Sequence, residues 1–213
     1  LNPMSEFEAF SERLRARLDH PLPGLAAQLA MAPSHRAGFK PPSGASIRKG
    51  AVMILVFPES DGISTLFTLR RDDLADHAGQ ISFPGGKRED GETFEEAALR
   101  ECEEEIGLER SGVNVLGKLS TLFIPPTRFV VHPFVGAVSE LPEITPDERE
   151  VASVLRVPLR TLTDPATHRE EDWTIGGAPS RVPFFHVDGH TIWGATAMIT
   201  AELLELLADI DAD

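Results

Sequence analysis

The chain has 213 residues and a formal net charge of −14 at pH 7, with 41% hydrophobic and 25% charged residues. These values are typical of a globular protein with one large domain, or one domain and an extension. An isoelectric point near 4.9 argues against general binding to nucleic acids or anionic membranes. A single cysteine, Cys102, excludes an internal disulfide and favours a cytoplasmic location. The longest apolar run, residues 51–57, is too short to span a bilayer.

The N-terminal part of the sequence predicts two helices followed by a loop. Residues 5–18 place apolar side chains at helical spacing, with Ser5 as a candidate N-cap. A second, shorter apolar helix is expected over residues 25–31. Residues 34–50 are rich in proline, glycine, serine and basic side chains, which is typical of a connecting loop.

Beyond this loop the sequence predicts mainly strands. Residues 51–57 form a continuous β-branched run, and residues 64–70 follow after a turn-like segment, so the two predict a hairpin. Further strands are expected over residues 112–122, 128–138, 151–159 and 183–193, the last with a turn at Asp188 and Gly189. Residues 196–210 predict an amphipathic helix. The order of elements favours an α+β fold, in which helices cover the faces of a mixed sheet.

One further helix is predicted in the middle of the chain, with clear signals at both ends. Thr93 and Glu96 have the spacing of a capping box, in which each side chain bonds the other residue's backbone N–H. Gly107 stands where a glycine commonly ends a helix. We therefore expect a helix over residues 94–106.

This helix carries more acids than a solvated face explains. At about 100° per residue, Glu101 and Glu105 fall within its apolar arc. Glu96 and Glu103 point away from that arc, and Glu104 lies at its edge. Two carboxylates on a core-facing stripe would lose hydration and repel each other, unless a cation lies between them. Ligation by oxygen atoms alone favours Mg²⁺ or Mn²⁺ as that cation.

The spacing of these residues resembles the signature of the Nudix hydrolases. The matching positions are Gly86, Glu92, Arg100, Glu101, Glu104, Glu105 and Gly107. The resemblance implies a Nudix-type α/β/α sandwich with a mixed β-sheet over residues 50–213. Residues 1–49 would then form an N-terminal helical extension and linker.

The same resemblance implies metal-dependent hydrolysis of a diphosphate. The catalytic acids and metal ligands would be Glu101, Glu104 and Glu105, and the backbone carbonyl of Gly86 would complete the ligand set. Glu92 and Arg100 would form a structural pair that braces the preceding loop against the helix. For the general base, Glu104 is the candidate, and Glu148 or Glu150 is the alternative.

Residues 66–86 resemble a further motif, that of the coenzyme A pyrophosphatase branch of this family. The matching residues are Thr68, Arg70, His77, Ala78, Gly79, Gln80, Phe83, Pro84, Gly85 and Gly86. Arg71 and Ala75 depart from the pattern. The resemblance implies that the substrate is coenzyme A or an acyl derivative, and that the products are 3′,5′-ADP and (acyl-)4′-phosphopantetheine.

Substrate contacts can be assigned to four residues of this segment. Arg70 and Arg71 are candidate phosphate donors, because a guanidinium binds phosphate in a fixed bidentate geometry. Gly85 and Gly86 let the backbone approach a diphosphate closely, although a plain turn explains a glycine pair equally well. His77 is as compatible with a structural role as with a phosphate contact.

Other functions fit parts of the sequence. Within the family, ADP-ribose or a nucleoside triphosphate is the alternative substrate. A catalytically silent nucleotide-sensing module is disfavoured by the complete set of acids. A diphosphate isomerase would need a cysteine in the pocket, and Cys102 lies within the apolar arc of the helix. Phe184 and Trp193 are expected in the core, with adenine stacking as the alternative.

Overall fold

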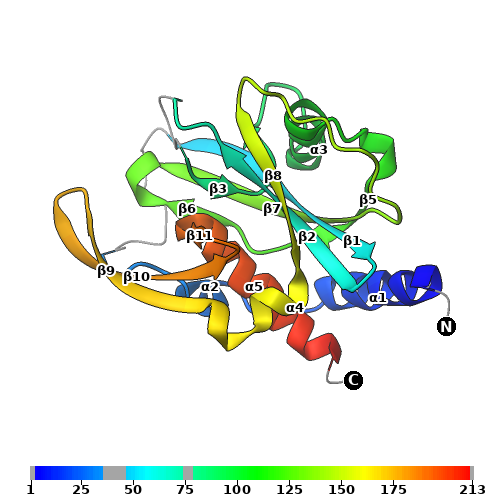
Figure 1. Ribbon diagram of the computed structural model, residues 1–213. Coiled ribbons are helices and arrows are strands. Elements are labelled where there is room, and N and C mark those ends of the chain that lie inside the picture. The colour runs from blue at the N-terminus through cyan, green and yellow to red at the C-terminus, as the bar shows by residue number, and fades with distance from the viewer. Residues whose placement is uncertain (1–2, 36–46, 74–78, 212–213) are drawn as a thin grey trace.

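Figure 1 shows the computed structural model, which describes residues 3–35, 47–73 and 79–211. Its main sheet has eight strands, and five of them follow the order β3-β2-β1-β7-β5. The neighbouring strands β1 and β7 run parallel, whereas the other pairs are antiparallel, so the predicted mixed sheet is confirmed. The strands are β1 (Arg48–Glu59), β2 (Gly62–Arg70), β3 (Ile81–Ser82), β4 (Gly85–Lys87), β5 (Asn114–Lys118), β6 (Leu122–Ile124), β7 (Phe129–Ala137) and β8 (Val151–Pro158).

Helices cover both faces of this sheet. In Figure 1 the helix α3 lies above the sheet, and α1, α2 and α5 lie below it. The α-helices are α1 (Pro3–Leu18), α2 (Leu25–Leu29), α3 (Phe94–Ile106), α4 (Leu159–Thr163) and α5 (Gly194–Asp211). Short 3₁₀ helices lie at η1 (Arg110–Gly112), η2 (Pro125–Thr127) and η3 (Pro165–Thr167). The α+β class and the helix–sheet–helix layering therefore agree with the prediction.

The sequence of the central strand β1 is continuously apolar because both faces of the strand are buried. Met53, Leu55 and Phe57 pack in the cluster on the α3 side. Ile54 and Val56 pack in the cluster on the opposite side. Because successive side chains of a strand point to opposite faces, a strand covered on both faces needs an apolar residue at every position.

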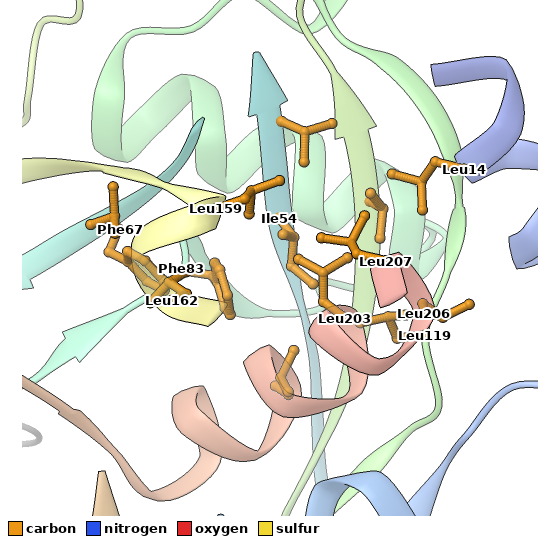
Figure 2. Packing of buried hydrophobic residues seen from close by; sticks show 14 of the residues in the cluster. Leu14, Ile54, Phe67, Phe83, Leu119, Leu159, Leu162, Leu203, Leu206 and Leu207 are labelled. Carbon is orange, nitrogen blue, oxygen red and sulfur yellow. The ribbon is translucent and has the colours of Figure 1, made fainter. Parts of the chain in front are cut away.

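The larger of the two cores lies between the sheet and α5. Figure 2 shows Leu203, Leu206 and Leu207 of α5 near Ile54 of β1, with Leu14 of α1 close by. Helix α1 therefore shares this core with the sheet and α5 instead of forming a core of its own. The division of the chain at residue 50 stays a prediction.

A second, smaller sheet was not predicted in full. It contains β9 (His168–Ile175), β10 (Ala178–Val187) and β11 (His190–Trp193), all antiparallel. The β10–β11 hairpin has the predicted turn, in which Asp188 and Gly189 have φ angles of 49° and 80°. The prediction missed β9, whose first five residues are exposed. In Figure 1 the β9–β10 hairpin projects from the body of the molecule.

Four details of the predicted elements were wrong. The strand predicted over residues 112–122 is divided into β5, which ends at Lys118, and β6, which begins at Leu122. Helix α1 begins at Pro3, so Ser5 lies inside it and is not its N-cap. The predicted loop over residues 34–50 is too long at its end, because β1 already begins at Arg48. Helix α2 ends at Leu29, two residues before the predicted boundary.

None of the helices in the described ranges is long and apolar enough to cross a membrane.

The aromatic residues discussed above lie in the second sheet. Phe184 is 3% exposed, as expected for a core residue, and its ring stacks on Trp173 with 5.5 Å between centroids. Trp193 is only partly buried and contacts Trp173 edge to face. Both residues therefore have a packing role in the β9–β11 sheet.

A fully buried glutamate, Glu202, joins three segments on the α5 side. One of its carboxylate oxygens accepts hydrogen bonds from the backbone N–H groups of Gly24 and Ser120, both at 3.1 Å. The other accepts one from Nε2 of Gln28 at 2.8 Å. A buried polar group is tolerated when its hydrogen-bonding capacity is met, and here three donors meet it.

Candidate active site

Helix α3 has the predicted bounds and the predicted caps. The backbone N–H of Glu96 donates to the Thr93 hydroxyl at 3.2 Å, and the N–H of Thr93 donates to the Glu96 carboxylate at 2.7 Å. Gly107 ends the helix in the left-handed conformation, with φ of 70°. These local bonds fix which residues of α3 face the sheet.

The loop over residues 139–150 closes the C-terminal end of this helix. The backbone N–H of Thr145 donates to the carbonyl of Ile106 at 3.0 Å. The N–H of Asp147 donates to the carbonyl of Glu105 at 2.9 Å. Carbonyls at a helix end lack partners within the helix, so the loop supplies them. The loop thereby brings Glu150 to the acidic side of α3.

The acidic side chains of α3 point toward the sheet or toward solvent as the helical periodicity predicts. Glu105 is 5% exposed, and the side chain of Glu101 is 16% exposed. Glu96 and Glu103 are exposed, as is the side chain of Glu104. A small cavity of about 130 Å³ opens beside them. It is lined by Glu101, Glu104, Glu105, Asp147, Arg149 and Glu150.

Two glycines of β4 lie close to Glu101 and Glu105 of α3. A Cβ atom on Gly86 would lie 2.3 Å from a carboxylate oxygen of Glu101, so a side chain there would displace this carboxylate. A Cβ on Gly85 would lie 2.4 Å from the carbonyl oxygen of Ala51. The backbone N–H of Gly85 donates to Glu105 at 3.3 Å. The glycine pair therefore allows both carboxylates of α3 to approach the β4 backbone.

Arg100 binds three carboxylates. Its Nε and Nη2 atoms donate to the two oxygens of Glu92, at 3.2 and 2.9 Å. Its Nη1 atom donates to Glu101 at 2.9 Å and to Glu104 at 3.0 Å. A further bond reaches the carbonyl of Lys87. The Glu92–Arg100 pair thus links the loop before α3 to the helix, and its structural role stays a prediction.

Burial and charge shift the pKa values of these acids in opposite directions. Burial, and then the charge of Glu101, raise the pKa of Glu105 to about 8, although Arg70 opposes the shift. Burial also raises the pKa of Glu101, against the effect of Arg100. Hydrogen bonds from Arg100 lower the pKa of Glu92 to about 2. Burial therefore disfavours the ionised forms of Glu101 and Glu105, whereas the bonds from Arg100 favour the ionised form of Glu92.

The two predicted phosphate contacts, Arg70 and Arg71, differ in their surroundings. Arg70 lies at the end of β2 beside the cavity, 3.6 Å from Glu105 and 3.6 Å from Glu150. Arg71 instead donates to both oxygens of Asp73, at 2.7 and 2.6 Å. A phosphate would have to compete with Asp73 for Arg71.

The strand before the glycine pair is positioned by a third residue of the predicted motif. The hydroxyl of Thr68 is buried and lies 3.3 Å from the carbonyl of Ser82 on the neighbouring strand β3. The backbone N–H of Met53 donates to the carbonyl of Pro84 at 2.9 Å. Thr68 therefore helps to hold the chain that leads to Gly85. Ala75 and His77 of the same motif lie outside the described residues.

The side chains fit a hard divalent cation. In the described part of the chain, no three His, Cys, Asp or Glu side chains already surround a common metal position. Arg100 holds Glu101 and Glu104, and Arg70 lies beside Glu105. The donors that face the cavity are nevertheless carboxylates, the ligand type that Mg²⁺ and Mn²⁺ prefer. A cation would also stabilise the ionised form of Glu105, whose pKa is raised by burial and by the charge of Glu101.

Two further residues of the site were missed by the sequence analysis. Asp147 and Arg149 line the cavity and pair with each other at 2.6 Å. Their loop was considered only for Glu148 and Glu150, and the side chain of Glu148 does not line the cavity. Cys102 is fully buried, as predicted, and burial raises the pKa of its thiol well above the usual value.

Comparison with known proteins agrees with this geometry. The family described as NUDIX domain matches residues 47–175, which is more than half of the chain. A Nudix hydrolase NudL of Yersinia enterocolitica is 38% identical over 141 residues, which cover 66% of this chain and 72% of that protein. A NudL of Yersinia pestis is 35% identical over 162 residues, covering 76% and 80% of the two chains. The chain therefore belongs to the Nudix hydrolase family.

Solved structures show the same fold. A Nudix hydrolase from M. smegmatis, RenU, superposes with a TM-score of 0.51 at 19% identity, over 83% of this chain and 96% of that one. The MutT protein from Methanosarcina mazei Go1 also gives a TM-score of 0.51, at 16% identity, over 78% and 99%. As a Nudix hydrolase, the protein is an enzyme that acts on diphosphate bonds, and such enzymes generally need a divalent metal ion such as Mg²⁺.

Proposed function

We propose that the enzyme hydrolyses the diphosphate bond of coenzyme A or its acyl derivatives, with Mg²⁺ or Mn²⁺. The products would be 3′,5′-ADP and (acyl-)4′-phosphopantetheine. The observation that carries the substrate assignment is the position of Arg70. It ends the strand whose motif resembles the coenzyme A branch, and its guanidinium lies beside the acidic cavity. Gly85 and Gly86, from the same motif, lie close to the carboxylates of Glu105 and Glu101.

The proposed reaction divides the work among residues of two elements. Glu101, Glu104 and Glu105 of α3, with the carbonyl of Gly86, would hold the cation. The bound metal would neutralise charge on the diphosphate and make a water molecule more acidic. A water molecule would add to one phosphorus while the bond from that phosphorus to the bridging oxygen breaks. The bridging oxygen would leave with the other phosphate, and a carboxylate would accept the proton of the water.

Two exposed carboxylates at the cavity are candidates for this base. Glu104 is the first, because it lies on α3 beside the proposed ligands and its side chain is 57% exposed. Glu150 is the rival, with a side chain that is 52% exposed. We expect Glu104→Gln to lower kcat more than Glu150→Gln, with little change in KM in either. The reverse order would assign the base to Glu150.

Substrate preference tests the assignment directly. Coenzyme A differs from ADP-ribose in its 3′-phosphate and its pantetheine arm. A charge-assisted contact to this phosphate is worth about 1.5–3 kcal/mol, or about ten- to a hundredfold in specificity. We therefore expect kcat/KM for coenzyme A to exceed that for dephospho-coenzyme A by this factor. A higher kcat/KM for ADP-ribose would leave only the general diphosphate hydrolase.

A further inference from the structure

Arg70 lies between two carboxylates without a close bond to either. Its Nη1 atom is 3.6 Å from Glu105, and its Nη2 atom is 3.6 Å from Glu150. Good N–H···O hydrogen bonds are shorter, at about 2.7–3.2 Å. Its Nε atom is buried and has no hydrogen-bond partner among the residues that the structure describes. Charge holds this guanidinium in place, while its hydrogen-bonding capacity remains largely unused.

Arg100, which binds Glu92, Glu101 and Glu104, is held very differently. All five of its hydrogen bonds are between 2.9 and 3.2 Å, and they use all three nitrogens of the guanidinium. An arginine bonded in this way cannot leave without large losses. Arg70 can leave, because it gives up only two loose ion pairs and gains hydrogen bonds wherever suitable acceptors are available.

The backbone beside Arg70 is firmly held, so that only its side chain is free to move. The backbone N–H of Arg70 donates to the carbonyl of Gln80 at 3.0 Å. The N–H of Arg71 donates to the carbonyl of Glu150, also at 3.0 Å. The end of β2 is thus tied both to the strand leading to the glycine pair and to the loop that closes α3.

We propose that Arg70 is the counter-ion of the metal-free pocket, which a divalent cation displaces and which then donates to the diphosphate. This inference depends on the metal-dependent function proposed above. Glu105 and Glu150 lose their neutralising charge when Arg70 leaves, and the cation replaces it. The diphosphate oxygens in turn supply the acceptors that Arg70 lacks in the metal-free protein. Metal binding and diphosphate binding are therefore coupled through one side chain.

The coupling has a definite sign. Without substrate, Arg70 competes with the metal for the Glu105 carboxylate and also repels the metal, so the arginine weakens metal binding. A proton competes for this carboxylate too, but a divalent ion feels twice the repulsion that a proton does. Removing the charge of Arg70 must then strengthen metal binding in the substrate-free enzyme. The opposite result is expected for a residue that merely supports the fold of the site.

Titration of the metal-free enzyme with Mn²⁺ tests this, with free Mn²⁺ followed by electron paramagnetic resonance and no substrate present. At about pH 8.5, where protons compete less for carboxylates, we expect Arg70→Gln to lower the Kd for Mn²⁺ at least about tenfold. Arg70→Lys keeps the charge and should stay within about threefold of the unsubstituted enzyme.

Arg156→Gln is the matched control for the change in net charge. Arg156 is 46% exposed and 3.7 Å from Glu59, and it does not line the cavity. Its substitution should leave the Kd within about twofold, because an exposed charge is screened. Circular dichroism spectra establish that each variant is folded, and Arg70→Met removes the same charge if the Arg70→Gln variant does not fold.

Two outcomes would overturn the inference. One is an Arg70→Gln variant that binds Mn²⁺ with the same or lower affinity than the unsubstituted enzyme. The other is an Arg70→Lys variant that binds as tightly as Arg70→Gln, since the effect would then not be one of charge. Neither outcome changes the expected order of kcat/KM among coenzyme A, dephospho-coenzyme A and ADP-ribose. A preference for ADP-ribose, in turn, does not change the expected Kd values for Mn²⁺. The two proposals therefore fail separately.

Discussion

Two buried glutamates, one on each side of the main sheet, are stabilised in contrasting ways. Glu202 of α5 is fully buried and accepts three hydrogen bonds, from Gly24, Gln28 and Ser120. Glu105 of α3 is 5% exposed and, among the residues that the structure describes, accepts a single backbone bond, from Gly85 at 3.3 Å. Its nearest cation is 3.6 Å away.

The difference separates a carboxylate that the fold satisfies from one that we propose binds a metal ion. Three donors replace the water that Glu202 lost on burial, so this side chain is satisfied by the fold itself. Glu105 lies near Glu101, and its pKa rises to about 8 because burial is not offset. An acid that the fold leaves unsatisfied next to a cavity is a candidate for a ligand-binding role. Burial alone would not have told the two apart.

Substitution of Glu202 is expected to have the largest effect, and on stability alone. Glu202→Ala leaves three donors without an acceptor in the core, which should lower the free energy of unfolding by about 3 kcal/mol or more. Urea unfolding measures this loss, and the folded fraction should keep its kcat. Glu205→Ala on the same helix is the control, because Glu205 is exposed. Equal losses in the two variants would contradict the structural role of Glu202.

Substitution of Glu105 or Glu101 should have the reverse pattern. Glu105→Gln and Glu101→Gln are each expected to slow hydrolysis by at least two decades, about 3 kcal/mol at 1.36 kcal/mol per decade. The metal-free Glu105→Gln protein should unfold at the same temperature or a higher one, since a neutral amide is easier to bury than a carboxylate. Steady-state rates and thermal unfolding in EDTA measure the two effects.

Glu103→Gln on the exposed face of the same helix is the control for these two substitutions. Glu103 is paired with Arg110 and does not line the cavity, so its substitution should leave the rate unchanged. Full activity in either Glu105→Gln or Glu101→Gln would remove that residue from the metal site. Activity undiminished in EDTA would remove both.

Much of this contrast was readable from the sequence on the α3 side. The caps of α3 are local signals, since Thr93, Glu96 and Gly107 act within one turn of the helix ends. The 3.6-residue period then placed Glu101 and Glu105 toward the sheet without knowledge of the rest of the fold. The paired strands β1 and β2 were equally readable, because both are rich in β-branched and apolar residues.

Features that depend on long-range contacts could not be read in this way. Strand β9 has no alternation of apolar and polar residues, since most of it is exposed and it forms by pairing with β10. The bonds from the 139–150 loop to the end of α3 join residues about 40 positions apart. Glu202 lies in an otherwise apolar helix pattern, and its three donors come from distant segments.

A smaller effect is expected at the Glu92–Arg100 pair, where a pH dependence can be derived. Arg100 lowers the pKa of Glu92 from 4.5 to about 2. A depressed folded-state pKa contributes stability that is present above 4.5 and is lost as the pH falls through about 2. Glu92→Gln should therefore lower the unfolding temperature at pH 7, and the difference should shrink as the pH falls below 4.5.

Arg100→Ala should lower both the unfolding temperature and the rate, because Arg100 supports Glu101 and Glu104 as well as Glu92. Thermal unfolding at several pH values, with rates at pH 7, measures these changes. An unchanged unfolding temperature with abolished turnover would place Arg100 in the chemistry instead.

The smallest effect is expected for Arg71, and it distinguishes the two arginines at the end of β2. Arg71 is already paired with both oxygens of Asp73, and its side chain is 42% exposed. A phosphate that binds Arg71 replaces one anion with another in solvent, so the gain is limited to the range of exposed ion pairs, about 0–1 kcal/mol. Arg71→Gln should then reduce the preference for coenzyme A over dephospho-coenzyme A by no more than about fivefold. Arg70→Gln should instead lower kcat/KM for both substrates by a similar factor, because both contain the diphosphate. A different result would contradict the roles given to the two residues: loss of the preference in Arg71→Gln, with kcat/KM for both substrates unchanged in Arg70→Gln.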